Sequence, residues 1–342
     1  MKLRLFAQWP VAIGALIAAP ILSAQATQTA SKAAPGKETK SWTMPRTVDG
    51  QPDLRGVWTN ATVTPLERPA EFAGKEFFTP AEAAAWAKRV TDRSNVDKRP
   101  TDVEADVAAA YNEAWWDRGT QVTGTLRTSL ISDPKDGKLP PMTAEGKARA
   151  AAAAEQRRLH LNEGPETRGL GERCLHMTQI GPPMMPGSYN NNYQIFQTKD
   201  TVAILIEMLH SVRIIRLNDR LNDTSHLPPT LRQWMGDSVG HWEGDTLVVD
   251  TTNFNDKTRF RGTSENLHLT ERFTRTDPNT ILYEFTVNDP STYTRPWTVQ
   301  MTMSHSDSKV YEYACHEGNY GMIGILSAAR AEEKAAAEKA AK

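Results

Sequence analysis

One alternation of residue types governs the second half of this sequence. From Tyr189 to about Cys315, apolar and polar residues alternate with a period of two, and β-branched and aromatic residues are common. Successive side chains of a strand leave opposite faces, so this period predicts β-strands. The segments with this pattern are 193–198, 201–208, 211–217, 246–254, 267–275, 281–287, 297–303 and 309–315.

Short turns separate most of these segments. Lys199-Asp200, Glu243-Gly244-Asp245, Asp277-Pro278-Asn279 and Ser306-Asp307-Ser308 each contain typical turn residues. Short turns join antiparallel neighbours, so the segments predict an antiparallel meander. About eight strands can close on themselves and remove their exposed edges. The sequence therefore predicts a mainly β protein with a lipocalin-like β-barrel, and an open sandwich is the alternative.

The residues on either side of the strands define the remaining regions. Residues 27–50 have the composition of a flexible leader. Residues 51–184 are expected to hold a strand near Val57-Trp58, a strand before the loop at Pro134, and two helices that pack on the barrel. Thr79 and Thr143 are the expected N-caps of these helices, and Pro80 is expected at the first helical position of the first. The barrel is assigned to residues 185–323, and residues 324–342 to a C-terminal helix of Ala, Glu and Lys.

The first residues indicate export. A basic start, MKLR, precedes an apolar stretch, VAIGALIAAPIL, and Ala24-Gln25-Ala26 offers the small residues that a signal peptidase recognises. We expect a signal peptide over residues 1–26 and a periplasmic or secreted product without membrane insertion. The formal net charge of −1 provides no basic face for nucleic acid. The partners then expected are small-molecule ligands or substrates.

The two cysteines, Cys174 and Cys315, are the first candidates for a disulfide in an oxidising compartment. Cys315 begins the motif Cys-His-Glu-Gly, which could also be a reactive centre or a metal site. On a strand, however, His316 and Glu317 point to opposite faces and cannot ligate one ion. No closely spaced set of three or four ligands occurs, so no metal is expected. A disulfide would hold His316 at the end of the last strand.

Alternation also predicts which polar residues face the interior. Glu271 shares a face with Leu267, Leu269 and Phe273, and Glu207 ends the apolar row of its strand. Arg213 lies among apolar neighbours and is a candidate partner for one of these carboxylates. Buried carboxylates must be paired, hydrogen-bonded or protonated. Each glutamate is thus either part of a structural ion pair or a general acid or base with a raised pKa.

Other catalytic signals are weak. Glu207-x-x-His210 resembles a metal motif that requires a helix, and this segment is expected to be a strand. Residues 236–240, GDSVG, match the nucleophile elbow only loosely and precede a hairpin where an esterase needs a helix. The sequence contains no glycine-rich phosphate loop and no dinucleotide motif. No cofactor is expected.

The sequence also resembles a family of exported bacterial proteins without an established activity. The resemblance rests on RQWMGDSVGHWEGDTLVVDTTNF and YACHEGNYGM, and on GPPMMPGSYNNNYQIFQT, PDLRGVWTN and RTSLISDPKDG. It covers nearly all of the mature chain. It implies that the parts before and after Tyr189 form one unit, and it assigns no catalytic residue.

Three functions remain open. The first is a cofactor-independent lyase, isomerase or hydrolase, with His316 or His176 as base, Glu271 or Glu207 as acid, and Arg213 or Arg261 stabilising negative charge. The second is a small-ligand-binding protein that uses Trp234, Trp242 and Trp297 as stacking surfaces. The third is a structural envelope protein with an internal ion-pair network. The density of acid, base and arginine residues beside apolar rows favours the enzyme.

Overall fold

Strands form the larger part of the folded chain. The computed structural model describes residues 42–98, 102–104, 113–217 and 225–341. The predicted signal peptide and most of the leader lie outside these residues. The strands are β1 (Gly56–Thr59), β2 (Ile131–Asp133), β3 (Asn192–Gln197), β4 (Thr201–Ile206), β5 (Ser211–Leu217), β6 (Asp237–Glu243), β7 (Thr246–Thr252), β8 (His268–Asp277), β9 (Thr280–Asn288) and β10 (Trp297–His305).

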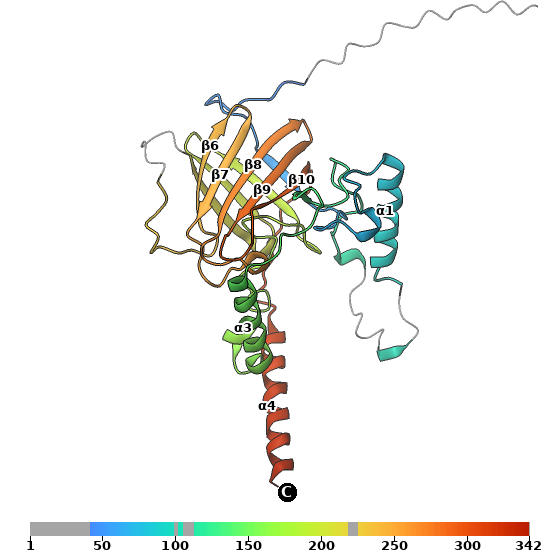
Figure 1. Cartoon of the computed structure of the whole chain (residues 1–342), viewed down its shortest axis with the longest axis vertical. Helices are drawn as coiled ribbons and strands as arrows, with labels where there is room; N and C mark the ends of the chain where they lie inside the picture. The colour runs from blue at the N-terminus through green and yellow to red at the C-terminus, as the bar shows by residue number, and fades with distance from the viewer. Residues whose placement is uncertain (1–41, 99–101, 105–112, 218–224, 342) are drawn as a thin grey trace, which may run out of the picture. The chain divides into compact units, whose positions relative to one another are not determined.

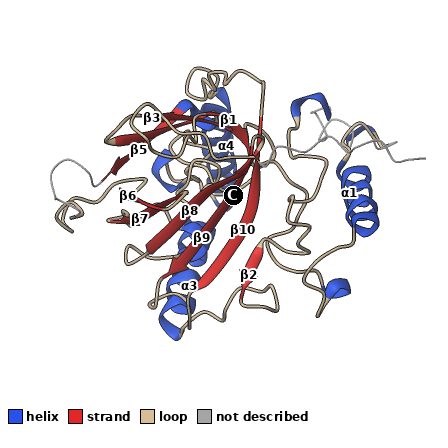
Figure 2. Ribbon diagram, turned by 90° about the horizontal axis from the view of Figure 1, so that it is seen from above, coloured by secondary structure: helices blue, strands red, loops and turns tan. Residues whose placement is uncertain are grey.

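The sheet closes into a barrel. Its order is β1-β3-β4-β5-β6-β7-β8-β9-β10-β2, and an additional pairing of β1 with β10 joins its ends. Nine strands form the closed wall and β2 extends β10. Figure 1 shows β6 to β10 side by side in this wall, and Figure 2 shows it from above. The predicted β-barrel is therefore confirmed.

Two details of the predicted meander are wrong. β5 and β6 run parallel, with Ile215 opposite Ser238, whereas a meander would make them antiparallel. Residues 309–315 also form no strand, although they alternate. β10 already pairs with β9 on one side and with β1 and β2 on the other, so no edge remains for another strand. Because residues 309–315 form no strand, alternation does not determine which way His316 points relative to its neighbours.

The barrel lumen is filled by large side chains. The strands send alternate residues inward, as β9 shows with its regular pattern of buried and half-buried positions. Most of the largest of these buried residues are aromatic: Trp58, Tyr193, Phe273, Tyr283, Phe285 and Trp297, with Arg213 the exception. Dense packing of this kind stabilises the barrel but provides little lumen volume for a ligand.

A proline-rich segment plugs one end of the barrel. This end, where β3, β6 and β8 begin, is called the plugged end below. Ile180, Met184 and Met185 are buried there, and the Met184 N–H donates to the Tyr283 hydroxyl inside the barrel at 3.1 Å. Gly181 has a φ of +63°, and an added Cβ would lie 2.6 Å from the Pro183 carbonyl carbon. The segment thus requires glycine at this turn.

The helices have separate positions. α1 (Pro80–Ser94) begins with the predicted Thr79 capping box, and its Trp86 packs with Val63 and Phe78 in a second apolar cluster. α3 (Ala144–His160) begins at the predicted Thr143 cap, and α4 (Tyr320–Ala340) ends the described chain. Within the described part of the chain, no helix combines the length and apolarity that crossing a membrane requires.

Candidate functional site

A cavity of about 1130 Å³ lies at the plugged end of the barrel. Four parts of the chain line it: Ala153 and Arg157 of α3, the segment from Glu166 to Tyr189, the loop between β7 and β8, and Trp234 before β6. This end collects long loops because the hairpin turns β3–β4, β6–β7 and β8–β9 lie at the other end. The strand order therefore determines where the cavity forms.

The lining of this cavity is strongly basic. Among its described lining residues, the only two carboxylates are Glu166 and Asp256, and six cationic side chains surround them: Arg157, Arg168, Arg173, Lys257, Arg259 and Arg261. Arg168 forms an ion pair with Glu172. The other five cations form no ion pair with any carboxylate of the described residues. A cavity with this excess of positive charge attracts anions and disfavours cations.

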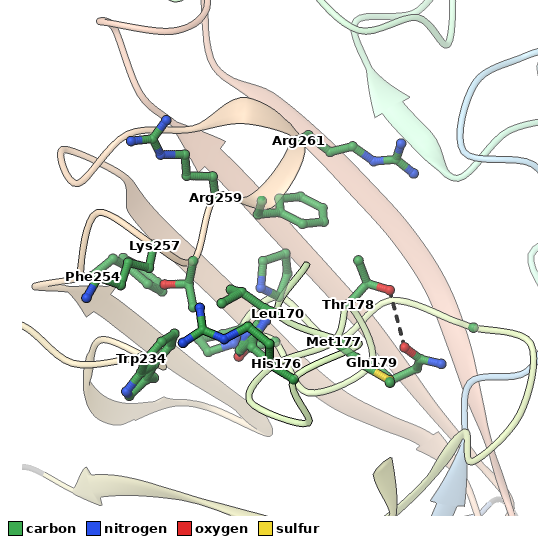
Figure 3. Close-up of a pocket in the computed structure, with 18 of the residues that line it drawn as sticks. Leu170, His176, Met177, Thr178, Gln179, Trp234, Phe254, Lys257, Arg259 and Arg261 are labelled. Atoms are coloured by element: carbon green, nitrogen blue, oxygen red, sulfur yellow. Dashed lines mark hydrogen bonds between the residues drawn. The ribbon is translucent and has the colours of Figure 1, made fainter. Parts of the chain in front are cut away.

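The cations surround the cavity and do not converge on one point. Figure 3 shows Lys257, Arg259 and Arg261 on one wall, with Arg259 and Arg261 extended in opposite directions, and Leu170 and His176 on the facing wall. Arg259 is held by the bond from its Nε to the Asp256 carbonyl at 2.8 Å. Dispersed cations suit an anion whose charges are spread over an organic framework.

Arg261 is fixed by its backbone. Its φ is +53°, a left-handed conformation that is uncommon for a residue with a long side chain. The Tyr293 hydroxyl donates to the Arg261 carbonyl at 2.6 Å and stabilises this turn. Burial raises the pKa of Tyr293 to about 12, so the hydroxyl keeps its proton for this bond. The backbone of the predicted Arg261 is therefore held in place, and its side chain lines the cavity.

His176 is the predicted base that the structure places in the cavity. Its Nε2 lies 3.2 Å from the Gly181 carbonyl oxygen, which can only accept a hydrogen bond. Nε2 therefore carries a proton, and Nδ1 keeps its lone pair in the neutral ring. Burial lowers the pKa of His176, although the bond to Gly181 opposes this shift. The neutral form is thus favoured near pH 7.

Glu271 and Arg213 form an ion pair inside the barrel. Arg213 Nη1 donates to Glu271 Oε1 at 3.0 Å, and Nη2 donates to Oε2 at 2.5 Å. The predicted inward position of Glu271 and its predicted pairing with Arg213 are confirmed. The Tyr283 hydroxyl also donates to Glu271 at 2.6 Å. The carboxylate is fully buried, so it cannot reach a ligand in the cavity as a general acid.

The remaining predicted acid and base also lie outside the cavity. Glu207 is buried at the end of β4, where its Oε2 accepts a bond from Asn192 Nδ2 at 2.8 Å. His316 is exposed in a turn that follows the disulfide, and it does not line the cavity with His176. This corrects the expectation that these groups share one active site.

The three predicted tryptophans have different positions. Trp234 is 38% exposed and lines the cavity. Trp297 is fully buried and stacks on Phe260, with ring centroids 5.9 Å apart, so it offers no face to a ligand. Trp242 packs against the core cluster. Of these three, Trp234 alone is placed to contact a ligand in the cavity.

The disulfide between Cys174 and Cys315 is present, as predicted, with a Cα–Cα distance of 5.7 Å. It joins the loop that carries His176 to the segment that follows the barrel. Asn319 Nδ2 donates to the Glu172 carbonyl beside it at 2.8 Å. These links fix one wall of the cavity to the end of the chain.

Most of the basic lining was not predicted from the sequence. Residues 168–173, RGLGER, and residues 256–261, DKTRFR, carry five of the six cations in loops that are distant in sequence. Their basic composition was the available signal. This composition indicates a basic cavity only once the barrel topology is known, because the topology brings both loops to one end.

Fold and site together define a closed β-barrel with a basic cavity at one end. No family model matches the chain, and no curated protein matches it. Among solved structures, the chain is similar to a mutant of the fluorescent protein UnaG, with 15% identity and a TM-score of 0.20. The match covers 34% of this chain and 72% of that one. A likeness at this TM-score carries no argument about fold or function.

Proposed function

We propose that this chain is an exported binding protein whose ligand is a small organic anion. The observation that supports the proposal is the cavity at the plugged end, where five basic side chains lack a carboxylate partner among the described residues. Arg173 is half-buried and the other four are exposed to solvent, but all five line one concavity instead of being spread over the surface. An anion of suitable size would neutralise them.

Aromatic groups of the cavity indicate an organic framework for this anion. Trp234 and the half-buried Phe260 line it together with the cations, whereas Phe254 is only 2% exposed. Aromatic faces contribute contact area, and arginines contribute directional hydrogen bonds to carboxylate or phosphate oxygens. A ligand with both a ring and acidic groups would use both.

The test compares three probes with the same ring and different charges. Isophthalate, isophthalamide and 1,3-bis(aminomethyl)benzene carry two negative, no and two positive charges at neutral pH. Calorimetric titration at low salt should detect binding of isophthalate, weak or absent binding of the amide, and none of the diamine. The affinity for isophthalate should fall with added salt. Equal affinity for the three probes, or preference for the diamine, would contradict the proposal.

His176 favours a second function, in which the same cavity catalyses a reaction. Its unprotonated Nδ1 could accept a proton from an anionic substrate, and the arginines could stabilise the charge that develops. Glu271 would have no part in this step. Conversion of a bound anion that His176→Gln abolishes without loss of binding would support the enzyme, and binding without conversion would support the binding protein.

Export is part of the proposal. The disulfide is consistent with an oxidising compartment, and the predicted signal peptide supplies the route. Cell fractionation followed by sequencing of the mature N-terminus tests both. A chain recovered in the cytoplasm with residues 1–26 attached would contradict export.

A further inference from the structure

A second cavity, of about 660 Å³, is lined by aromatic residues. Trp115, Trp116, Tyr189, Asn190 and Tyr313 form its walls, and none of these side chains is charged. This set is called the aromatic slot below. Tyr189 also borders the basic cavity, but the other four residues belong to the slot alone. We propose that the aromatic slot binds a neutral saccharide.

Three separate segments build the slot. Trp115 ends a 3-10 turn (Glu113–Trp115), and the backbone N–H of Asp117 donates to the Ser188 carbonyl at 2.9 Å, which joins this turn to Tyr189. The Tyr189 and Tyr313 hydroxyls are 3.5 Å apart. The disulfide that begins two residues after Tyr313 holds this third segment in place. The rings are therefore positioned by tertiary contacts and are not incidental surface residues.

The chemistry of the slot favours a sugar. The apolar faces of sugar rings pack on indole and phenol rings, and Trp115 is 69% exposed and offers such a face. Sugar hydroxyls need donors and acceptors at the edges. Asn190 provides both through its amide, and its left-handed φ of +55° is one that asparagine tolerates. The two tyrosine hydroxyls add a second pair of such groups.

The same contacts disfavour a cationic ligand. Aromatic pockets can also bind quaternary ammonium groups through ring faces. Here the Arg118 guanidinium carbon already lies 4.4 Å from the centre of the Trp116 ring. This guanidinium occupies a face of Trp116 that a ligand cation would need, and Glu113, whose Oε2 lies 3.6 Å from Arg118 Nη2, is already paired with it. The volume is also much larger than a trimethylammonium group requires.

The experiment titrates the intact, oxidised protein with cello-, malto-, xylo- and chitohexaose, and separately with tetramethylammonium chloride. Indole resonances of Trp115 and Trp116 and calorimetry report binding. We expect at least one saccharide to bind and Trp115→Ala to weaken it about tenfold or more, as loss of an aromatic anchor does. Trp42→Ala, which removes an exposed indole outside the slot, should leave the affinity within about twofold.

The outcomes separate clearly. Absence of binding by every saccharide at millimolar concentration would overturn the proposal, and so would equal affinity of the wild type and Trp115→Ala. Binding of tetramethylammonium alone, lost in Trp115→Ala, would show that the class of ligand is wrong. Circular dichroism checks that Trp115→Ala is folded. If it is not, Trp115→Phe replaces it in the test; this variant keeps a ring and should retain part of the affinity.

Discussion

Arg213 and Glu271 face each other inside the barrel as a bidentate ion pair whose side chains are 1% and 0% exposed. Ser238 and Thr251 accept further bonds from the guanidinium at 3.0 Å, so the pair belongs to a network that spans β5, β6, β7 and β8. Desolvation makes such a pair costly to break, because removal of one partner leaves a buried charge.

Substitution of either partner should strongly destabilise the protein. Arg213→Met and Glu271→Leu should each lower the free energy of unfolding by about 3–5 kcal/mol, and the double variant should lose less than the sum. Arg272 and Glu243 are the matched control, because this pair lies on the outer face and is 41% and 50% exposed. Arg272→Met should cost less than about 1 kcal/mol. Urea unfolding measures each value, and additive losses at the buried pair would refute the coupling.

Loss of the disulfide should destabilise the fold and the aromatic slot together. The bond closes a loop with a sequence separation of 141, for which the chain-entropy model gives roughly 5 kcal/mol as an upper value. Cys174→Ser with Cys315→Ser should lower the unfolding midpoint in urea, and reductant should reproduce the effect in the wild type. A double variant with an unchanged midpoint would show that packing alone holds residues 309–319.

Stability should depend on pH through a cluster on the barrel surface. His226 bridges Asp237 at 3.0 Å and Asp250 at 2.8 Å, and His268 also bonds Asp250. Carboxylate oxygens only accept, so both His226 nitrogens must carry protons to make both bonds. Arg216 donates to Asp237 as well. The cluster thereby holds His226, which precedes β6 in the chain, against strands β6 and β7.

The direction of this pH dependence follows from the pKa shifts. The bond to Asp250 raises the pKa of His268 above 6.5, so its contribution is complete below the unfolded value and is lost as pH rises through the folded value. Burial raises the pKa of Asp250, but the bonds from His268 and His226 outweigh it, so its contribution is lost as pH falls through the lowered value. The thermal unfolding midpoint of the wild type should decline above about pH 6.5, and the midpoint of His268→Gln should decline less over the same range. An equal decline in the variant would contradict this assignment.

His176 should titrate below its usual range. Burial disfavours the charged ring and lowers its pKa from 6.5. The Hε1 and Cε1 resonances of His176, assigned with His176→Gln, should give a midpoint below 6.5 in the ligand-free protein. A midpoint at or above that value would mean that burial does not favour the neutral ring.

Local pattern predicted much of this fold. Alternation identified most strands and the inward position of Glu271, and the caps Thr79 and Thr143 marked two helix starts, because each depends on neighbouring residues. Residues 309–315 also alternate, but a strand needs a partner, and β10 already pairs with β9 on one side and with β1 and β2 on the other. Local pattern carries no information about such competition.

The candidate site was much less predictable. Arg213 and Glu271 could be paired because both interrupt apolar rows, whereas Lys257 and Arg259 lie in a loop without periodicity. Whether they line the same cavity as His176 depends on which loops the strand order brings to the plugged end. Basic side chains are common in loops, and only the grouping of several around one cavity indicates a site.

The most direct test of the anion-binding proposal is the affinity for isophthalate of a variant with two cavity cations removed. Lys257→Gln with Arg259→Gln should weaken binding by about tenfold or more, since both residues lose their charge at the cavity wall. Lys199→Gln, at the β3–β4 turn on the opposite end of the barrel, should bind like the wild type. Unchanged affinity in the double variant, or an equal loss in Lys199→Gln, would contradict the account.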